Sequence, residues 1–157
     1  MTRASTALRR VRVVILTGGL GPTIDDLTRE AVAQATGHRL SRRKAALDAM
    51  IARLAEWGRT PTTSQFRQAM IPARAEILSN PVGTAPGFSL VWKGSFLAAL
   101  PGVPREMEPM VRDGVLPQLQ AWMRTQKRIS ATPMIRRVLH TSGVPESVVD
   151  QALAGLV

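Results

Sequence analysis

The sequence predicts an α/β domain with a mostly parallel sheet, and three observations lead to this fold class. Residues 11–16, VRVVIL, are β-branched and nearly all apolar, as in a strand that is buried on both faces of a parallel sheet. Glycines end this run, and residues 27–36 continue with the apolar spacing of a helix. LPGVPREM at 100–107 repeats the order of apolar strand, Pro-Gly turn and helix.

Thr23, followed three residues later by Asp26, resembles a capping box for the helix at 27–36. A second helix is expected from Ser41 to Trp57, because its apolar residues fall on one face and Gly58 follows it. The other expected elements are a short helix at 63–70, a strand at 75–78, a shaped loop at 80–88, hairpin strands at 89–92 and 95–100, and helices at 104–112 and 114–124 with Pro117 as an interruption.

The chain divides at a polar stretch, RTQKRISATP, which is typical of a linker. We therefore expect a first domain at 1–123, a linker at 124–132 and a second segment at 133–157. The second segment should hold a strand at 134–143 and a short helix that begins near Pro145.

Composition excludes several classes of function. The chain has no cysteine, which excludes thiol catalysis, thiolate metal sites and disulfides. The apolar stretch after the basic N-terminus is too short for a secretion signal, and no apolar run approaches the ~20 residues of a membrane-spanning helix. We therefore expect a cytoplasmic protein with no membrane partner.

The net charge of +10 suits anionic partners. The arginines are spread along the sequence, tyrosine is absent and few aromatic residues could stack on bases, so we do not expect a nucleic-acid partner. A solvated, arginine-rich surface explains much of the charge, and a phosphate-bearing small molecule remains compatible with it.

The stretch TGGLGPTIDDLT, residues 17–28, combines a glycine-rich turn with the start of a helix. Backbone N–H groups and a helix N-terminus at one spot favour an anion such as phosphate, and Gly18, Gly19 and Gly21 permit a close approach. The turn matches neither the Walker motif nor the dinucleotide fingerprint. A tight strand-to-helix turn without a ligand is the alternative.

Asp25 and Asp26 stand at the expected helix start, where acidic residues commonly serve as caps. The functional alternative is that they hold Mg²⁺ or a similar cation beside a bound phosphate. Carboxylates at the edge of an anion site repel the anion unless a cation or protonation intervenes. We therefore consider Asp25 and Asp26 as metal-binding and catalytic candidates.

Two further turns could share this site. The loop NPVGTAPGF is expected at a strand end, where ligands of parallel sheets bind, and the turn at 101–106 has Pro104 and Glu106 at a helix start. His38 and His140 lack partners at metal-ligand spacing and are read as ordinary surface or packing residues.

The motifs TGGLGPTIDDLTREAVA, QAMIP, NPVGTAPGF and LPGVPREMEPMV, taken in this order, resemble the CinA family of competence/damage-inducible proteins. The resemblance covers about Val13 to the end, and HTSGVPES resembles the beginning of that family's next domain. It implies a three-layer α/β/α domain of the molybdopterin-binding, MoaB/MogA-like type.

The resemblance also implies a pocket for the phosphate group of a pterin or nucleotide, and metal-dependent hydrolysis of the pyrophosphate of ADP-ribose. Asp25 and Asp26 would hold the metal, and metal-activated water would be the nucleophile. The ligand-binding residues expected on this basis are Thr17, Gly18, Gly19, Gly21, Thr23, Asn80, Gly83, Thr84, Gly87, Pro101, Gly102 and Glu106.

The sequence also departs from the family pattern. Family domains begin several tens of residues earlier, with strands and a Gly-Asp-Glu-Leu type motif that are not present here. We therefore expect part of the site to be absent and a sheet edge to be open, where a partner such as a second copy in a homodimer could bind. We do not expect nicotinamide mononucleotide deamidation, which belongs to a C-terminal domain of longer CinA proteins. The alternative function is a module without catalysis, either a pterin or nucleotide binder or an interaction module left by truncation.

Overall fold

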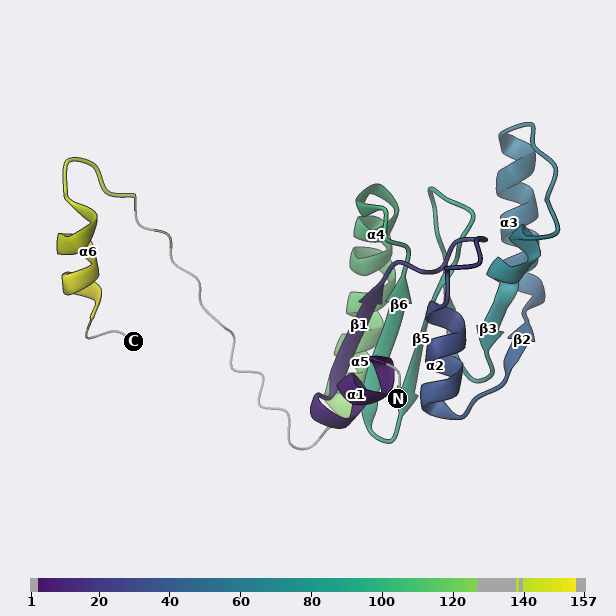
Figure 1. Ribbon diagram of the computed structural model, residues 1–157, viewed down its shortest axis with the longest axis horizontal. Coiled ribbons are helices and arrows are strands. Elements are labelled where there is room, and N and C mark those ends of the chain that lie inside the picture. The colour runs from purple at the N-terminus through teal and green to yellow at the C-terminus, as the bar shows by residue number, and fades with distance from the viewer. Residues whose placement is uncertain (1–2, 127–137, 139, 155–157) are drawn as a thin grey trace. The chain divides into compact units, whose positions relative to one another are not determined.

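A mixed four-stranded sheet forms the centre of the computed structural model, which describes residues 3–126, 138 and 140–154 (Figure 1). The strand order is β1-β6-β5-β4. The bounds are Val13–Thr17 for β1, Glu76–Leu78 for β4, Gly87–Trp92 for β5 and Ser95–Leu100 for β6. β1 is parallel to β6, and the other two pairs are antiparallel. The predicted α/β class is confirmed, and the sheet is mixed, with one parallel pair among the three pairs described.

The expected hairpin is present as β5 and β6, which pair from Phe88 with Ala99 to Trp92 with Ser95. Lys93 and Gly94 both have positive φ, 48° and 81°, as in the two-residue turns that match the twist of paired strands. Every residue of β6 is buried, because this strand lies inside the sheet and is covered on both faces.

Helices lie on both faces of the sheet (Figure 1). On one face, α1 (Arg3–Arg10) and α2 (Thr28–Thr36) lie over the sheet, and Leu8 and Val32 pack with Phe88 and Leu97 in the main core. On the other face, α4 (Pro104–Met110) is joined to α5 (Leu116–Thr125). The α5 residue Trp122 packs against Phe96, with ring centroids 5.9 Å apart. The three layers agree with the predicted sandwich.

Three local predictions differ from the structure. Residues before the first strand form α1, which we did not expect. Ser41 and Arg42, expected in a helix, belong to β2 (Leu40–Arg42), which pairs antiparallel with β3 (Met70–Pro72); α3 then begins at Lys44 and ends at Glu56. The expected helix at 63–70 is the short 3₁₀ helix η1 (Gln65–Ala69). Pairing between residues 30 positions apart overrides the local helical pattern there.

Pro117 does not interrupt the second pair of expected helices. A π-helical segment, Val111–Val115, joins α4 to α5, and Pro117, which has no backbone N–H to donate, lies just after this segment of wider hydrogen bonding. The segment 104–125 is therefore one helical run.

β1 was expected to be buried on both faces, and this expectation is wrong. Val14 faces the core and is buried, but Ile15 on the opposite face is 46 % exposed. β1 is the edge strand of the described sheet, and on that face Trp122 packs over the neighbouring strand β6, at Phe96.

The chain forms two compact units, residues 1–127 and 128–157. In the second unit the described residues form α6 (Glu146–Leu153), close to the expected start at Pro145. The strand expected at 134–143 and the linker fall largely outside the described residues. Within the described part of the chain, no helix has the length and apolar character needed to cross a membrane.

Candidate functional site

Three turns meet around a cleft of about 440 Å³ at the carboxyl ends of β1 and β6. The cleft brings together nine of the expected site residues from segments far apart in the sequence: Gly18, Gly19, Gly21, Asp26, Gly83, Thr84, Pro101, Gly102 and Glu106. The expectation of one shared pocket agrees with this geometry.

The turns after β1 and β6 touch through their backbones. The Gly18 N–H donates to the Leu100 carbonyl at 2.9 Å, which extends the pairing of the two strands. A Cβ on Gly102 would lie 3.2 Å from the Gly18 Cα. The lack of a side chain at Gly102 therefore permits this close approach, whereas a Cβ on Gly18 would lie 4.0 Å from the Gly102 Cα, an ordinary contact distance.

Gly18 and Gly19 have φ values of 87° and 69°, which turn the chain back toward the start of α2. The Gly18 carbonyl accepts a 2.7 Å hydrogen bond from Thr28 Oγ1, and the Gly19 carbonyl accepts one of 3.1 Å from the Thr28 backbone N–H. Thr28 was not among the expected site residues, although it ends the motif that drew attention to the turn.

Arg29 holds the next two carbonyls. Its side chain is fully buried, and its Nη1 and Nη2 atoms donate to the carbonyls of Leu20 and Gly21 at 2.8 and 2.7 Å. Burial lowers the pKa of Arg29, an effect that the charges of Glu30 and Asp26 oppose. Arg29 remains charged even so, because the guanidinium group is not deprotonated in proteins.

Four successive carbonyls, from residues 18 to 21, are thus bound on the α2 side of the turn. In a trans peptide the N–H points opposite to the carbonyl of the same unit, and no cis peptide occurs in the described residues. The N–H groups of Gly19 and Leu20 therefore point away from Thr28 and Arg29. This orientation suits an anion.

Asp26 already occupies part of this electropositive region. Its Oδ2 accepts hydrogen bonds from the Thr23 N–H at 2.9 Å and from the Thr23 hydroxyl at 2.7 Å, and the same hydroxyl contacts Asp25 Oδ1. Partial burial raises the pKa of Asp26, but hydrogen bonds from Thr23 and Gly21 and the charge of Arg29 outweigh it, so that its pKa is lowered. Asp26 is therefore ionised at neutral pH.

The capping-box expectation is correct only in part. Asp26 accepts from the Thr23 N–H as the acid of a capping box does, but α2 begins at Thr28 and its N-cap residue, Leu27, makes no side-chain cap. Thr23 and Asp26 instead close a turn within the loop, ahead of the helix.

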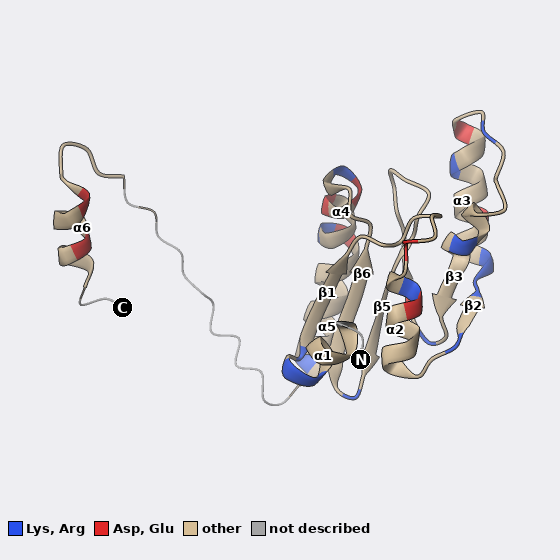
Figure 2. Cartoon of the chain, in the orientation of Figure 1, with Lys and Arg blue, Asp and Glu red and all other residues tan. Residues whose placement is uncertain are grey.

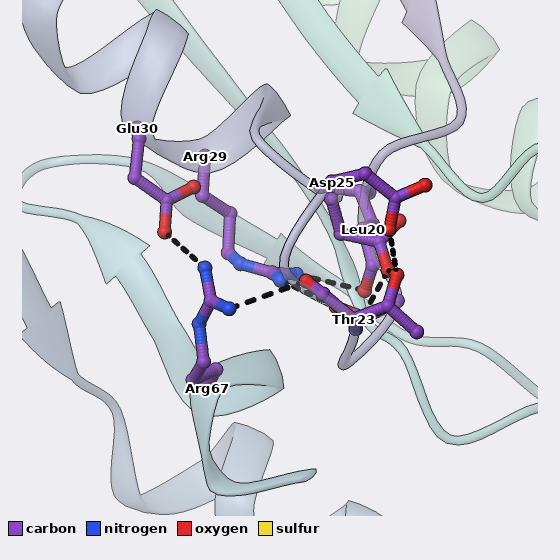
Figure 3. A network of polar contacts seen from close by, with 8 residues as sticks. Leu20, Thr23, Asp25, Arg29, Glu30 and Arg67 are labelled. Atoms are coloured by element: carbon purple, nitrogen blue, oxygen red, sulfur yellow. Dashed lines mark hydrogen bonds and ion pairs between the residues drawn. The ribbon is translucent and has the colours of Figure 1, made fainter. Parts of the chain in front are cut away.

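Arg67 also binds the loop that contains Thr23 (Figure 3). From η1 its Nη1 donates to the Thr23 carbonyl and its Nη2 to Glu30 Oε1, both at 3.2 Å. The loop is thus held by the arginines of two different elements, Arg29 from α2 and Arg67 from η1. Nothing in the local sequence around Arg67 signalled this role.

Asn80 organises the second turn from outside the cleft lining. Its Oδ1 accepts from the N–H groups of Val82 and Gly83 at 3.0 and 2.8 Å, and its Nδ2 donates to the Ala85 carbonyl at 2.9 Å and to Glu106 Oε2 at 2.7 Å. A Cβ on Gly83 would clash with the Glu106 carboxylate. The 80–86 loop and the start of α4 are thus joined by a hydrogen bond and by close packing.

Four other expected residues do not line the cleft: Thr17, Thr23, Asp25 and Gly87. Gly87 lies in β5, where a Cβ would approach the Ala99 carbonyl to 2.7 Å, so its small size serves packing. Five residues that line the cleft were not expected: Leu20, Trp57, Gln68, Ala85 and Val103. Gln68 is the first residue of the QAMIP motif, which could have pointed to it.

A divalent cation would find few protein ligands here. No cluster of three or more His, Asp or Glu side chains suited to a metal occurs in the described part of the chain. Asp25 and Asp26 meet at the Thr23 hydroxyl, and Glu106 lines the same cleft as Asp26. Mg²⁺ commonly binds through one or two carboxylates together with substrate phosphates, and the pair Asp25 and Asp26 is a ligand set of that size.

The basic residues are spread over the described part of the chain, and none of the residues that line the cleft is Lys or Arg. Figure 2 shows Lys and Arg on α1, α2, α3 and α4 and on β2. The expectation of a dispersed basic surface agrees with this distribution.

The chain is similar to proteins of a known family. The model of the family described as "Probable molybdopterin binding domain" matches residues 2–121. A CinA-like protein of Myxococcus xanthus is 40 % identical over 148 residues, covering 94 % of this chain and 35 % of the relative. A CinA-like protein of Frankia casuarinae is 41 % identical over 159 residues, covering 98 % of this chain and 35 % of the relative.

A solved structure supports the same relationship. The crystal structure of the protein CinA from Thermoplasma acidophilum, described as having unknown function, is 38 % identical in sequence and superimposes with a TM-score of 0.64. The match covers 73 % of this chain and 66 % of that chain. The chain spans about a third of the length of the curated relatives that it matches, 35 % in both cases given above.

Proposed function

Because the chain belongs to the CinA-like proteins with a molybdopterin-binding domain, we propose that its cleft binds a phosphate-bearing small molecule and, with a divalent cation, hydrolyses the pyrophosphate bond of ADP-ribose. The observation that carries the proposal is the turn at 18–21, whose carbonyls are bound by Thr28 and Arg29 and whose residues line the cleft. The choice of ADP-ribose follows the family resemblance.

In this proposal, backbone N–H groups, a buried arginine and two acidic residues together determine how a diphosphate binds. The N–H groups of Gly19 and Leu20 donate to phosphate oxygens, and the buried charge of Arg29 lies behind them. Glu106, held by Asn80, limits the cleft at the turn after β6. The carboxylates of Asp26 and Glu106 would repel a diphosphate, and a bound cation would offset this repulsion.

Asp26, with Asp25, would hold the cation in this proposal. A bound divalent cation would neutralise phosphate charge and lower the pKa of a water molecule at the site. Hydrolysis joins the oxygen of a water molecule to one phosphorus, and the bond from this phosphorus to the bridging oxygen breaks. The products are AMP and ribose 5-phosphate, and the proton of the water passes to solvent or a carboxylate.

The test is the release of AMP from ADP-ribose by the purified chain with Mg²⁺, Mn²⁺ or Co²⁺. We expect metal-dependent turnover that Asp26→Asn abolishes. Asp48→Asn is the matched control, since Asp48 pairs with Lys44 on α3 and does not line the cleft. Absence of AMP from a folded chain with every metal would overturn the catalytic part of the proposal.

A second candidate function is binding without catalysis. It is favoured by Asp26, whose carboxylate is already bound by N–H and hydroxyl groups of its own loop. Under this alternative Asp26→Asn leaves the affinity for ADP-ribose or a pterin phosphate intact, and no product forms.

A further inference from the structure

Trp57 and Gln68 line the same cleft as the glycine turn, and the proposed function assigns no role to either residue. Trp57 follows the last residue of α3 and is 46 % exposed. Gln68 lies on η1, next to Arg67, and is 3 % exposed. They reach the cleft from two elements other than the three turns.

Gln68 has an oxygen that the protein does not satisfy. Within the described residues its Oε1 atom is buried and has no hydrogen-bond partner. A buried acceptor without a partner lowers stability, and native proteins contain few of them. A ligand in the cleft could supply the missing donor. An ionised phosphate offers only acceptor oxygens, so the chemistry of Gln68 Oε1 suits an N–H or O–H group instead.

Trp57 offers a flat apolar surface at the same cleft. The guanidinium carbon of Arg59 lies 5.8 Å from the centroid of the Trp57 ring and covers one face of the indole. An exposed indole attracts flat aromatic rings, because stacking removes apolar surface of both rings from water. A stacking surface and an unsatisfied acceptor in one cleft suit a ligand with a flat ring and an N–H or O–H donor.

We propose that Trp57 and Gln68 form a ring-binding subsite, in which a nitrogen heteroaromatic ring stacks on Trp57 and donates an N–H hydrogen bond to Gln68 Oε1. The phosphates of the same ligand lie at Gly19 and Leu20. Adenine and a pterin share this chemistry. The subsite rests on the proposed function, since both use one cleft, and it determines which phosphate compounds bind there.

The test is calorimetric titration of the chain, with Mg²⁺ present, with ADP-ribose and with inorganic pyrophosphate, which has no ring. We expect Trp57→Ala and Gln68→Met each to weaken ADP-ribose binding by about tenfold and to leave pyrophosphate binding unchanged. Trp57→Phe keeps a stacking ring and should bind nearly as wild type. Phe66→Ala is a matched control, because Phe66 is an exposed aromatic on η1 that does not line the cleft.

Stability separates binding from a structural role. Gln68→Met removes an unsatisfied buried oxygen with little change in size, so the melting temperature of the free chain should equal or exceed that of wild type. A phosphorylated pterin, used as a third ligand, shows which ring binds better.

Four results would overturn the subsite, and the last of them would also overturn the proposed function. If Trp57→Ala and Gln68→Met both bind ADP-ribose as tightly as wild type, the two residues do not bind the ring. If the variants lose equal affinity for ADP-ribose and for pyrophosphate, the two residues support the structure of the cleft and do not recognise a ring. A wild-type chain that binds pyrophosphate but binds ADP-ribose no better also excludes the subsite while the phosphate site stands. Binding of neither ligand overturns the proposed function together with the subsite.

Discussion

Asn80 donates a 2.7 Å hydrogen bond from Nδ2 to Oε2 of Glu106, which joins the 80–86 loop to the first turn of α4. The same amide also holds the N–H groups of Val82 and Gly83 and the carbonyl of Ala85. The Asn80 side chain therefore fixes both the shape of this loop and its distance from Glu106, an acidic residue of the cleft.

Replacing Asn80 should loosen two turns at once. Asn80→Asp puts a carboxylate beside Glu106 and removes the donor, so we expect a loss of about 1–3 kcal/mol in the free energy of unfolding. Urea denaturation at pH 7 measures it. No measurable loss would argue against the Asn80 hydrogen bonds as a source of stability.

Arg29→Met tests how the glycine turn is held. The substitution leaves the carbonyls of Leu20 and Gly21 without their charged donor. Hydrogen bonds to charged groups contribute about 1.5–3 kcal/mol, so we expect a destabilisation of at least this size and weaker pyrophosphate binding. Arg67→Met, on the more exposed side of the loop, is the comparison and should cost less. Equal costs would show that the burial of Arg29 is not decisive.

Gly19→Ala should be more harmful than Gly37→Ala. The two glycines have nearly equal φ values, 69° and 71°, so the backbone strain of an alanine, about 1–2 kcal/mol, is common to both. A Cβ at Gly19 would clash with Thr28 Oγ1, whereas a Cβ at Gly37 meets nothing within 4 Å. The difference between the two unfolding free energies measures the close approach of the turn to α2. Equal values would mean that the turn has room to move.

The lowered pKa of Asp26 predicts a dependence of stability on pH. A carboxyl whose folded pKa lies below its ordinary value of 3.8 stabilises the folded state above that value and loses this contribution as the pH falls through the folded pKa. Asp26→Asn should therefore be less stable than wild type at pH 7, and the two should converge in strong acid. Denaturation of both proteins from pH 7 to pH 2.5 is the measurement. A constant difference would exclude the ionised carboxylate as its source.

The sequence predicted those parts of the fold whose signals are local. β1, the turn after it and α2 form one continuous pattern, and the β5–β6 hairpin has a two-residue turn. β2 and β3 were missed because each is only three residues long and forms by pairing with the other across 30 positions. Their residues carry no alternating pattern of their own.

The candidate site divides in the same way. The glycines and carboxylates of the site could be identified from the sequence, because residue type and spacing within the motifs are enough to indicate their chemistry. Arg29, Arg67, Trp57 and Gln68 act through contacts that depend on the folded arrangement of α2, α3 and η1. A buried arginine or glutamine in a helical stretch gives no local signal of the loop or cleft that it meets.

The four carbonyls of the glycine turn are held by two consecutive residues, Thr28 and Arg29, in the first turn of α2. The turn cannot open while that end of the helix is wound, and fraying of the helix end releases all four carbonyls together. Backbone amides of the turn and of the start of α2 should therefore exchange with deuterium as one cooperative unit, and a ligand that binds the turn should slow both to the same degree.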